Sequence, residues 1–118
     1  MRILHLTACA LAFSIAAAAP ASAGAIKKQS DFVAAVAGKK LVSGNSWIVV
    51  GADGKLTGVS SKGEKIVGAW VWNKRFVCRN VYIGNTQLPQ DCQTVSLDGN
   101  TVTFTRNKGK GKSVTYSF

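Results

Sequence analysis

The chain has 118 residues, with 15 Lys or Arg and 5 Asp or Glu, so its formal net charge is +10. This length allows one domain, and 47% hydrophobic with 17% charged residues excludes an intrinsically disordered chain. Twelve glycines and two prolines exclude a collagen-like or proline-rich rod.

The first 23 residues have the pattern of a secretory signal peptide. Arg2 gives a positive start, residues 6–19 are uncharged and rich in Leu and Ala, and Ala21-Ser22-Ala23 is a small-x-small cleavage pattern. The apolar run is short for a membrane span, which needs about 20 residues, so a retained anchor is the weaker alternative. We therefore expect residues 1–23 to be cleaved and residues 24–118 to form a single β-rich domain, periplasmic or secreted.

One short helix of about seven residues is predicted next. Ser30 can cap its start, and Gly38 suits the position just after its end. Phe32 and Val36 would share one face because they lie four residues apart. Beyond this helix the hydrophobic pattern changes to the two-residue period of strands.

Strands joined by short turns are predicted from there to the end of the chain. Asp98-Gly99-Asn100 is the strongest hairpin signal. The predicted strands are 47–50, 55–60, 66–73, 76–83, 90–97, 101–105 and 113–118. This order predicts a mainly β fold, a small antiparallel meander that closes as a barrel or sandwich. The strands are shorter than the roughly 9–11 residues of membrane-barrel strands, so we expect no membrane span in the mature chain.

The tryptophans of strand 66–73 have two interpretations. Trp70 and Trp72 share one face, and Ala69 and Val71 share the other, so the strand is either central or covered on its Trp face by the helix. We interpret these aromatic side chains as core. A ligand-binding aromatic platform is the alternative.

Cys78 and Cys92 are predicted to form a disulfide. They are the two cysteines beyond the signal, and an even pair in an oxidising compartment indicates a crosslink. A hairpin centred on Asn85 would place them directly opposite each other. The same register places Arg79 opposite Asp91 on the other face, where we expect a surface ion pair.

Several catalytic chemistries lack their residues. The only histidine, His5, lies in the predicted signal, which removes Ser-His-Asp and Cys-His pairs and the common zinc sites. Turns, a helix start or the predicted ion pair explain every carboxylate except Glu64, so no pair is spare for glycoside hydrolysis. Gly111-Lys112-Ser113 resembles the end of a phosphate-binding loop, but Arg106 occupies the position of its first glycine. We expect no enzyme activity, no cofactor and no metal.

Basic residues are the main indication of function. They occur as pairs at 27–28, 39–40 and 74–75 and fill a glycine-rich loop at 106–112. The residues predicted to bind anions are Arg106, Lys108, Lys110 and Lys112. The partner would be an anionic envelope component, such as lipopolysaccharide phosphates, or a protein. The alternative is a solvated basic surface that keeps the protein soluble, and no motif supports sequence-specific nucleic-acid recognition.

The second half of the chain carries an ordered set of motifs. They are Trp70-x-Trp72, Cys78-Arg79, Asp91-Cys92-Gln93-x-Val95, Asp98-Gly99, Val102-Thr103-Phe104 and Gly109-x-Gly111. In these motifs the chain resembles a group of small secreted proteins common in alphaproteobacteria, some of which carry the name dihydrodipicolinate reductase. That name implies a nicotinamide-binding unit, for which the chain has no Gly-x-Gly-x-x-Gly between a strand and a helix. The resemblance implies a secreted, disulfide-linked β fold and supplies no catalytic residues.

These observations lead to one hypothesis and one alternative. The hypothesis is a non-enzymatic periplasmic or secreted binding module, with a basic surface suited to an anionic envelope component or protein. The alternative is a secreted inhibitor of a protease or other hydrolase, because small disulfide-linked β proteins often act by presenting a rigid loop.

Overall fold

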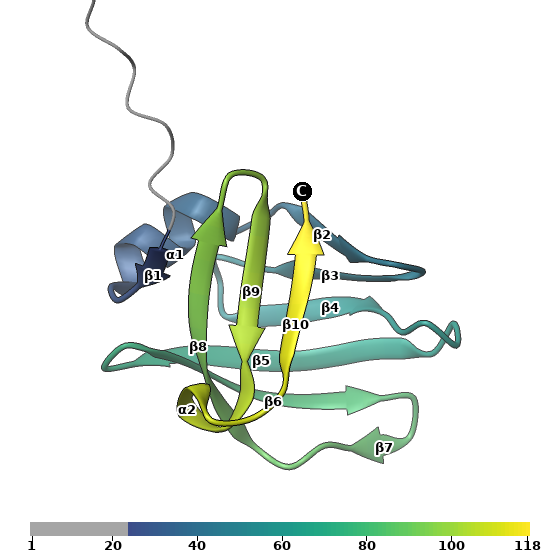
Figure 1. Cartoon of the computed structure of the whole chain (residues 1–118). Helices are drawn as coiled ribbons and strands as arrows, with labels where there is room; N and C mark the ends of the chain where they lie inside the picture. The colour runs from purple at the N-terminus through teal and green to yellow at the C-terminus, as the bar shows by residue number, and fades with distance from the viewer. Residues whose placement is uncertain (1–23) are drawn as a thin grey trace, which may run out of the picture.

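The computed structural model of the protein describes residues 24–118, so the expected signal peptide at 1–23 lies outside the described residues. Within residues 24–118, ten strands and two short helices follow one another (Figure 1). The elements are β1 (Gly24–Ile26), α1 (Gln29–Val36), β2 (Lys40–Ser43), β3 (Ser46–Val50), β4 (Lys55–Val59), β5 (Lys65–Asn73), β6 (Phe76–Ile83), β7 (Thr86–Gln87), β8 (Asp91–Asp98), β9 (Thr101–Thr105), α2 (Arg106–Gly109) and β10 (Ser113–Ser117).

Eight of these strands form a closed antiparallel barrel. Strands β2 to β6 pair in chain order, β6 pairs with β8, and β9 and β10 continue the sheet. The circuit closes where Ser117 of β10 pairs with Val42 of β2. Strand β1 lies beside β8, and β7 lies beside β6. The expectation of a mainly β meander is confirmed, in its barrel form, and in Figure 1 β8, β9 and β10 cross the direction of β3 to β6.

The predicted strands are confirmed with small changes at their ends. Strands β6 and β9 have the predicted bounds, β3, β4, β5 and β10 differ by one residue at one end, and β8 is shifted by one residue at both ends. The sequence does not predict β2, although the barrel closes through it. Four residues in which Leu41 alone is fully buried are too few to show a two-residue period.

Helix α1 confirms the predicted helix and its buried face. Phe32 and Val36 are both fully buried. Ser30 is not the cap, because Lys28 stands at that position and makes no side-chain capping hydrogen bond. Gly38 follows the helix with a φ of 76°, a left-handed conformation that lets the chain turn into β2.

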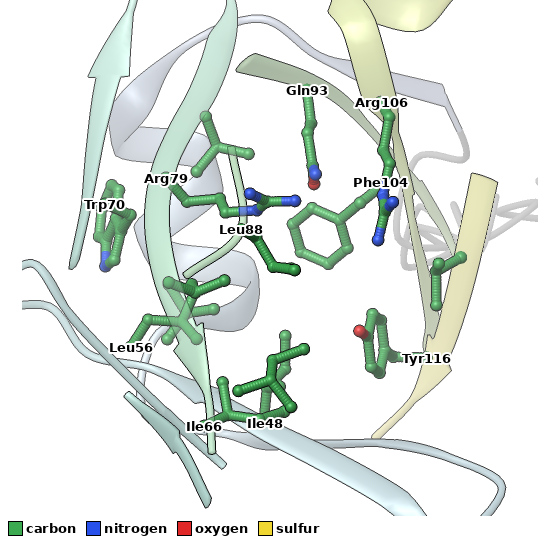
Figure 2. Close-up of a pocket in the computed structure, with 15 residues that line it drawn as sticks. Ile48, Leu56, Ile66, Trp70, Arg79, Leu88, Gln93, Phe104, Arg106 and Tyr116 are labelled. Carbon is green, nitrogen blue, oxygen red and sulfur yellow. The ribbon is translucent and has the colours of Figure 1, made fainter. Parts of the chain in front are cut away.

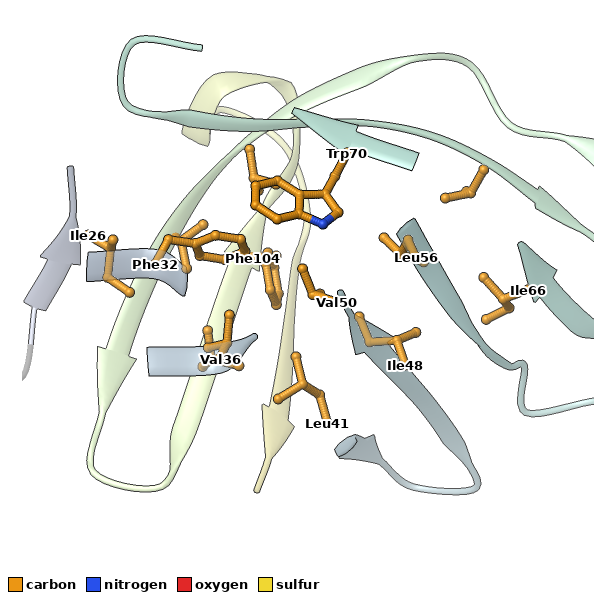
Figure 3. Packing of buried hydrophobic residues seen from close by; sticks show 14 residues of the cluster. Ile26, Phe32, Val36, Leu41, Ile48, Val50, Leu56, Ile66, Trp70 and Phe104 are labelled. Atoms are coloured by element: carbon orange, nitrogen blue, oxygen red, sulfur yellow. The ribbon is translucent and has the colours of Figure 1, made fainter. Parts of the chain in front are cut away.

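The helix packs across one end of the barrel and completes its core. The ring of Phe32 lies 5.2 Å from the rings of both Trp70 and Trp72, centroid to centroid. The helix therefore covers the Trp face of β5, which was one of the two predicted arrangements. Trp70 is 5% exposed, and its Nε1–H donates to the carbonyl oxygen of Gly51 at 2.8 Å, so its polar atom is satisfied. Figure 3 shows Trp70 and Phe32 among aliphatic side chains of the barrel strands, which confirms Trp70 as core.

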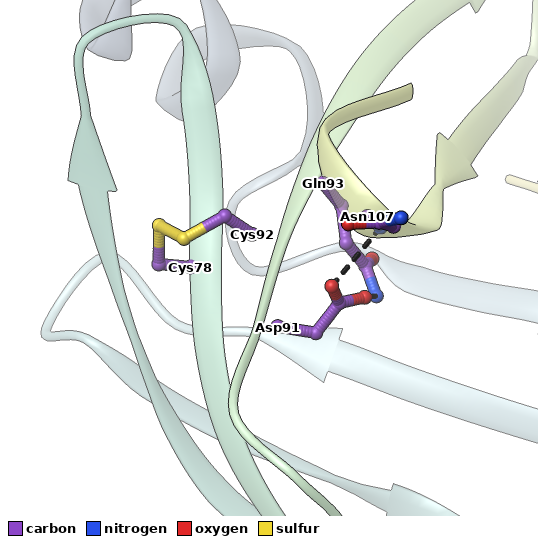
Figure 4. The surroundings of a disulfide bond; sticks show 5 residues. All are labelled: Cys78, Asp91, Cys92, Gln93 and Asn107. Atoms are coloured by element: carbon purple, nitrogen blue, oxygen red, sulfur yellow. Dashed lines mark hydrogen bonds between the residues drawn. A yellow bond between two sulfur atoms is a disulfide. The ribbon is translucent and has the colours of Figure 1, made fainter. Parts of the chain in front are cut away.

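The predicted disulfide is present between β6 and β8 (Figure 4). Cys78 and Cys92 are directly opposed, and their sulfurs lie 2.08 Å apart. The connection differs from the predicted single hairpin, because the chain first forms β7, in which Gln87 pairs with Tyr82. The register then shifts by one residue across 88–90 before β8 pairs with β6.

Candidate functional site

The interior of the barrel contains a cavity of about 120 Å³. Its walls are mostly apolar, with aliphatic side chains from β3 to β6 and the rings of Trp70 and Phe104. Figure 2 shows Arg79, Gln93 and Arg106 pointing toward one part of this space, across from its aliphatic side. The cavity thus combines an apolar compartment with a small group of polar side chains, which is the usual composition of a small-molecule site.

Arg79 reaches the cavity because of the alternation along β6. Val77, Arg79 and Val81 line the cavity, so their side chains share the inner face of the strand. The Nη1 group of Arg79 donates to the carbonyl oxygen of Pro89 at 2.8 Å. Burial lowers the pKa of Arg79. The negative charge of Asp91 acts to raise this pKa, and the positive charge of Arg106 acts to lower it further. The guanidinium is therefore a cation that has lost part of its hydration and has a second cation nearby.

Asp91 does not form the expected surface ion pair with Arg79. The two residues are paired across the strands as predicted, but the carboxylate accepts hydrogen bonds from other groups (Figure 4). Its Oδ2 accepts from Nε2 of Gln93 at 3.0 Å, and its Oδ1 accepts from the backbone N–H of Asn107 at 3.0 Å. The carboxylate therefore anchors the turn of α2 to β8.

Arg106 and Tyr116 complete the polar side of the cavity. Arg106 is the first residue of α2, directly after β9, and Tyr116 lies on β10. Burial raises the pKa of Tyr116, and the positive charges of Arg106 and Arg79 act in the opposite direction. The cavity is therefore lined by two guanidinium groups and one phenol hydroxyl, which come from β6, from the end of β9 and from β10.

The structure separates the four residues predicted to bind anions. Arg106 lines the barrel cavity, whereas Lys108 lines a groove outside it with Nζ 5.8 Å from the centroid of the Phe76 ring. Lys110 and Lys112 are exposed and line neither space. The predicted glycine-rich loop contains the short turn of α2, in which Asn107 and Lys108 have non-helical backbone angles, and it is closed by the N–H of Arg106, which donates to the carbonyl oxygen of Lys112 at 2.9 Å.

Sequence reasoning missed Arg79 and Gln93 as site residues. Arg79 alternates with Val77 and Val81, which is the signal that places it on the inner face of the barrel. Gln93 alternates in the same way with Val95, and both are buried. The predicted pairing of Arg79 with Asp91 is correct, but it concealed this alternation because it offered a surface explanation for both charges.

Comparison of the sequence with protein-family models, with curated proteins and with solved structures gave no match. The family resemblance inferred from the motifs therefore stays a prediction. No helix within residues 24–118 combines the length and the apolar character needed to cross a membrane. The same residues contain no group of three or more His, Cys, Asp or Glu side chains with an arrangement that could hold a metal ion.

Proposed function

We propose that the protein is a periplasmic or secreted, non-enzymatic binding module that takes a small amphipathic anion into its barrel. The apolar part of the ligand would lie against the aliphatic walls and Phe104, and its charged group would meet Arg79 and Arg106. The disulfide is compatible with the oxidising compartment that this proposal requires.

The observation that carries the proposal is a pair of guanidinium groups facing an apolar cavity. Among the residues that line the cavity, all within 24–118, none is an aspartate or glutamate. A cation that is partly removed from water is costly unless an anion compensates it, and the charge of Asp91 only partly offsets the burial that lowers the pKa of Arg79. A carboxylate suits this position because guanidinium groups bind carboxylates with two parallel hydrogen bonds.

The size of the cavity limits the apolar part of the ligand. At about 120 Å³, it is somewhat smaller than an apolar protein cavity of about 150 Å³ that binds benzene. The apolar part can therefore be no larger than a single ring or a short branched chain, with the carboxylate toward the arginines. A small monocarboxylate of this kind is the ligand class that we propose.

The experiment compares a charged and an uncharged probe of the same shape. Benzoate and benzyl alcohol are titrated into the protein by calorimetry, and isovalerate serves as an aliphatic probe. We expect a carboxylate probe to bind at least about tenfold more tightly than benzyl alcohol, since charge-assisted hydrogen bonds are the stronger ones. Equal affinities for benzoate and benzyl alcohol, or no binding of either carboxylate, would overturn the proposal.

Variants locate the binding within the barrel. Arg106→Met removes an exposed guanidinium at the cavity, and Arg79→Met removes the half-buried one. Lys112→Met, which removes a charge from the same loop outside the cavity, is the matched control. Both arginine variants should weaken the affinity for benzoate at least about fivefold, and the control should leave this affinity unchanged. Far-ultraviolet circular dichroism establishes that each variant is folded.

Salt dependence separates this proposal from the inhibitor alternative. Binding of a small anion to two arginines weakens as salt screens the charges, whereas a packed protein–protein interface changes much less. The inhibitor alternative also places the active surface on a loop outside the barrel. Inhibition of a hydrolase that is insensitive to salt and retained by Arg79→Met would favour that alternative.

A further inference from the structure

A groove lies outside the barrel where β8 changes its neighbour. Strand β8 pairs with β6 as far as Gln93 and with β1 from Val95 onward. The two neighbouring strands separate around Thr94, and a groove of about 290 Å³ occupies this place. The groove is separate from the barrel cavity, since no residue lines both.

Three cations from three different segments line the groove. They are Lys27 just after β1, Arg75 just before β6, and Lys108 of α2, and all three are exposed. None of the lining residues, which all belong to the described part of the chain, is acidic. Like charges in one groove repel each other. A ligand with several negative charges would relieve this repulsion and would be attracted to all three cations at once.

The floor of the groove is apolar. Ile26 and Val95 are buried core residues that also line it, and the Phe76 ring lines it beside two of the basic side chains. The Arg75 guanidinium lies 5.9 Å and the Lys108 Nζ 5.8 Å from the centroid of the Phe76 ring. Both contacts are within the range of a cation–π interaction, which positions the two cations at the ring.

The backbone that presents Lys108 is strained. Asn107 and Lys108 have φ values of 52° and 53°, in the left-handed region that a lysine rarely adopts. Asp91 holds this turn through the N–H of Asn107. Strain of this kind persists where the surrounding structure enforces it, and it is concentrated at functional sites.

We propose that this groove is a second anion site, which binds a phosphate monoester carried on a sugar. A phosphate monoester carries a charge of about −1.5 to −2 at neutral pH and three acceptor oxygens, which matches the three cations that line the groove better than one carboxylate does. The apolar floor of Ile26, Val95 and Phe76 suits the C–H face of a sugar ring. The phosphosugar can be free or attached to a lipid, and the experiment separates these two sources.

The test uses probes that differ only in the phosphate or in its attachment. Glucose 1-phosphate and methyl glucoside are titrated into ¹⁵N-labelled protein, and binding is followed by amide chemical shifts. Phosphatidylcholine vesicles with and without lipid A are tested by cosedimentation. A response to glucose 1-phosphate and none to methyl glucoside supports a free ligand, and cosedimentation only with lipid A supports a lipid-linked one. A protein that responds to neither phosphate probe would overturn the proposal.

A second lysine in the loop of Lys108 provides the sharpest control. Lys108→Ser and Arg75→Ser should each weaken the affinity for glucose 1-phosphate at least about fivefold. Lys110→Ser, which removes one positive charge of the same loop from outside the groove, should change this affinity less than about twofold. An equal loss in Lys110→Ser would mean that only the overall charge matters and would overturn the site. Arg79→Met should leave phosphate binding intact, so this proposal can fail or stand independently of the barrel ligand.

A glycine at position 108 separates function from stability. Lys108→Gly removes the charge and also relieves the left-handed strain, because glycine adopts a positive φ freely. We expect this variant to unfold at a higher temperature than the wild type and to lose phosphate affinity. A Lys108→Gly variant that keeps full affinity would overturn the role of this lysine.

Discussion

The rings of Phe32 and Trp70 meet edge to face, with their centroids 5.2 Å apart and their planes at 75°. This contact joins α1 to the wall of the barrel. The helix has eight residues, fewer than the roughly 12–15 that an isolated helix needs to be stable in water. Its stability therefore depends on the buried face that Phe32 and Val36 present to the barrel.

Replacing Phe32 with alanine should lower the free energy of unfolding by about 3–5 kcal/mol, the usual cost of removing a buried aromatic ring. The substitution removes the ring that packs against both Trp70 and Trp72, so urea unfolding followed by tryptophan fluorescence reports on it directly. Val71→Ala is the control, because Val71 on the opposite face of β5 is 62% exposed. Equal losses in the two variants would contradict the packing of Phe32 as a core residue.

Most of the fold could be predicted from the sequence because its signals are local. Residues 76–83 and 101–105 alternate and end at turns, so β6 and β9 have the predicted bounds. The two residues of β7 are too few to show any period, and the closing pair of Ser117 with Val42 joins distant parts of the chain. The choice between barrel and sandwich therefore needed the structure.

The sequence shows only part of the candidate site. The direction of Arg79 follows from its alternation with Val77 and Val81, but its partner, the carbonyl oxygen of Pro89, lies in the segment 88–90 where the register shifts. Arg106 stands where β9 ends and alternation no longer applies. These two arginines line one cavity because the sheet closes into a barrel, and this closure brings distant strands to face the same interior.

The disulfide should stabilise the barrel without being required for its topology. It closes a loop between residues 14 apart, and a loop of about 15 residues corresponds to about 3 kcal/mol of chain entropy. Cys78→Ser combined with Cys92→Ser should lower the free energy of urea unfolding by about this amount and keep the circular dichroism spectrum. Reducing the wild type should give the same loss, and reducing the double variant should have no effect. A reductant-sensitive double variant would contradict the assignment.

Gly68 should not tolerate a side chain. It lies on the inner face of β5, where an added Cβ would overlap the carbonyl oxygen of Asn80 and lie 2.7 Å from Cγ1 of Val81. The close approach of β5 and β6 therefore requires glycine at this position. Gly68→Val should cost about 3 kcal/mol or more in thermal unfolding, whereas Ala69→Val, at the next and exposed position, should cost little. Similar melting temperatures in the two variants would contradict this packing.

Stability should decrease in alkaline solution through Tyr116. Burial raises its pKa above the ordinary value of 10.0, so the folded protein holds the phenol proton more tightly than the unfolded chain does. The contribution is complete below pH 10 and is lost as the pH rises through the higher pKa of the folded state. Tyr116→Phe should remove this part of the pH dependence, as measured by urea unfolding at a series of pH values on both sides of about 10.

Arg106 supplies the internal control for this titration. Its positive charge lowers the pKa of Tyr116 and so works against burial. Arg106→Met should therefore shift the ultraviolet titration of the half-buried Tyr116 to still higher pH, and Tyr82→Phe identifies which transition belongs to Tyr116. A downward shift, or none, would mean that the arginine and the phenol do not share the cavity, and the binding site proposed for the barrel would lose one of its two cations.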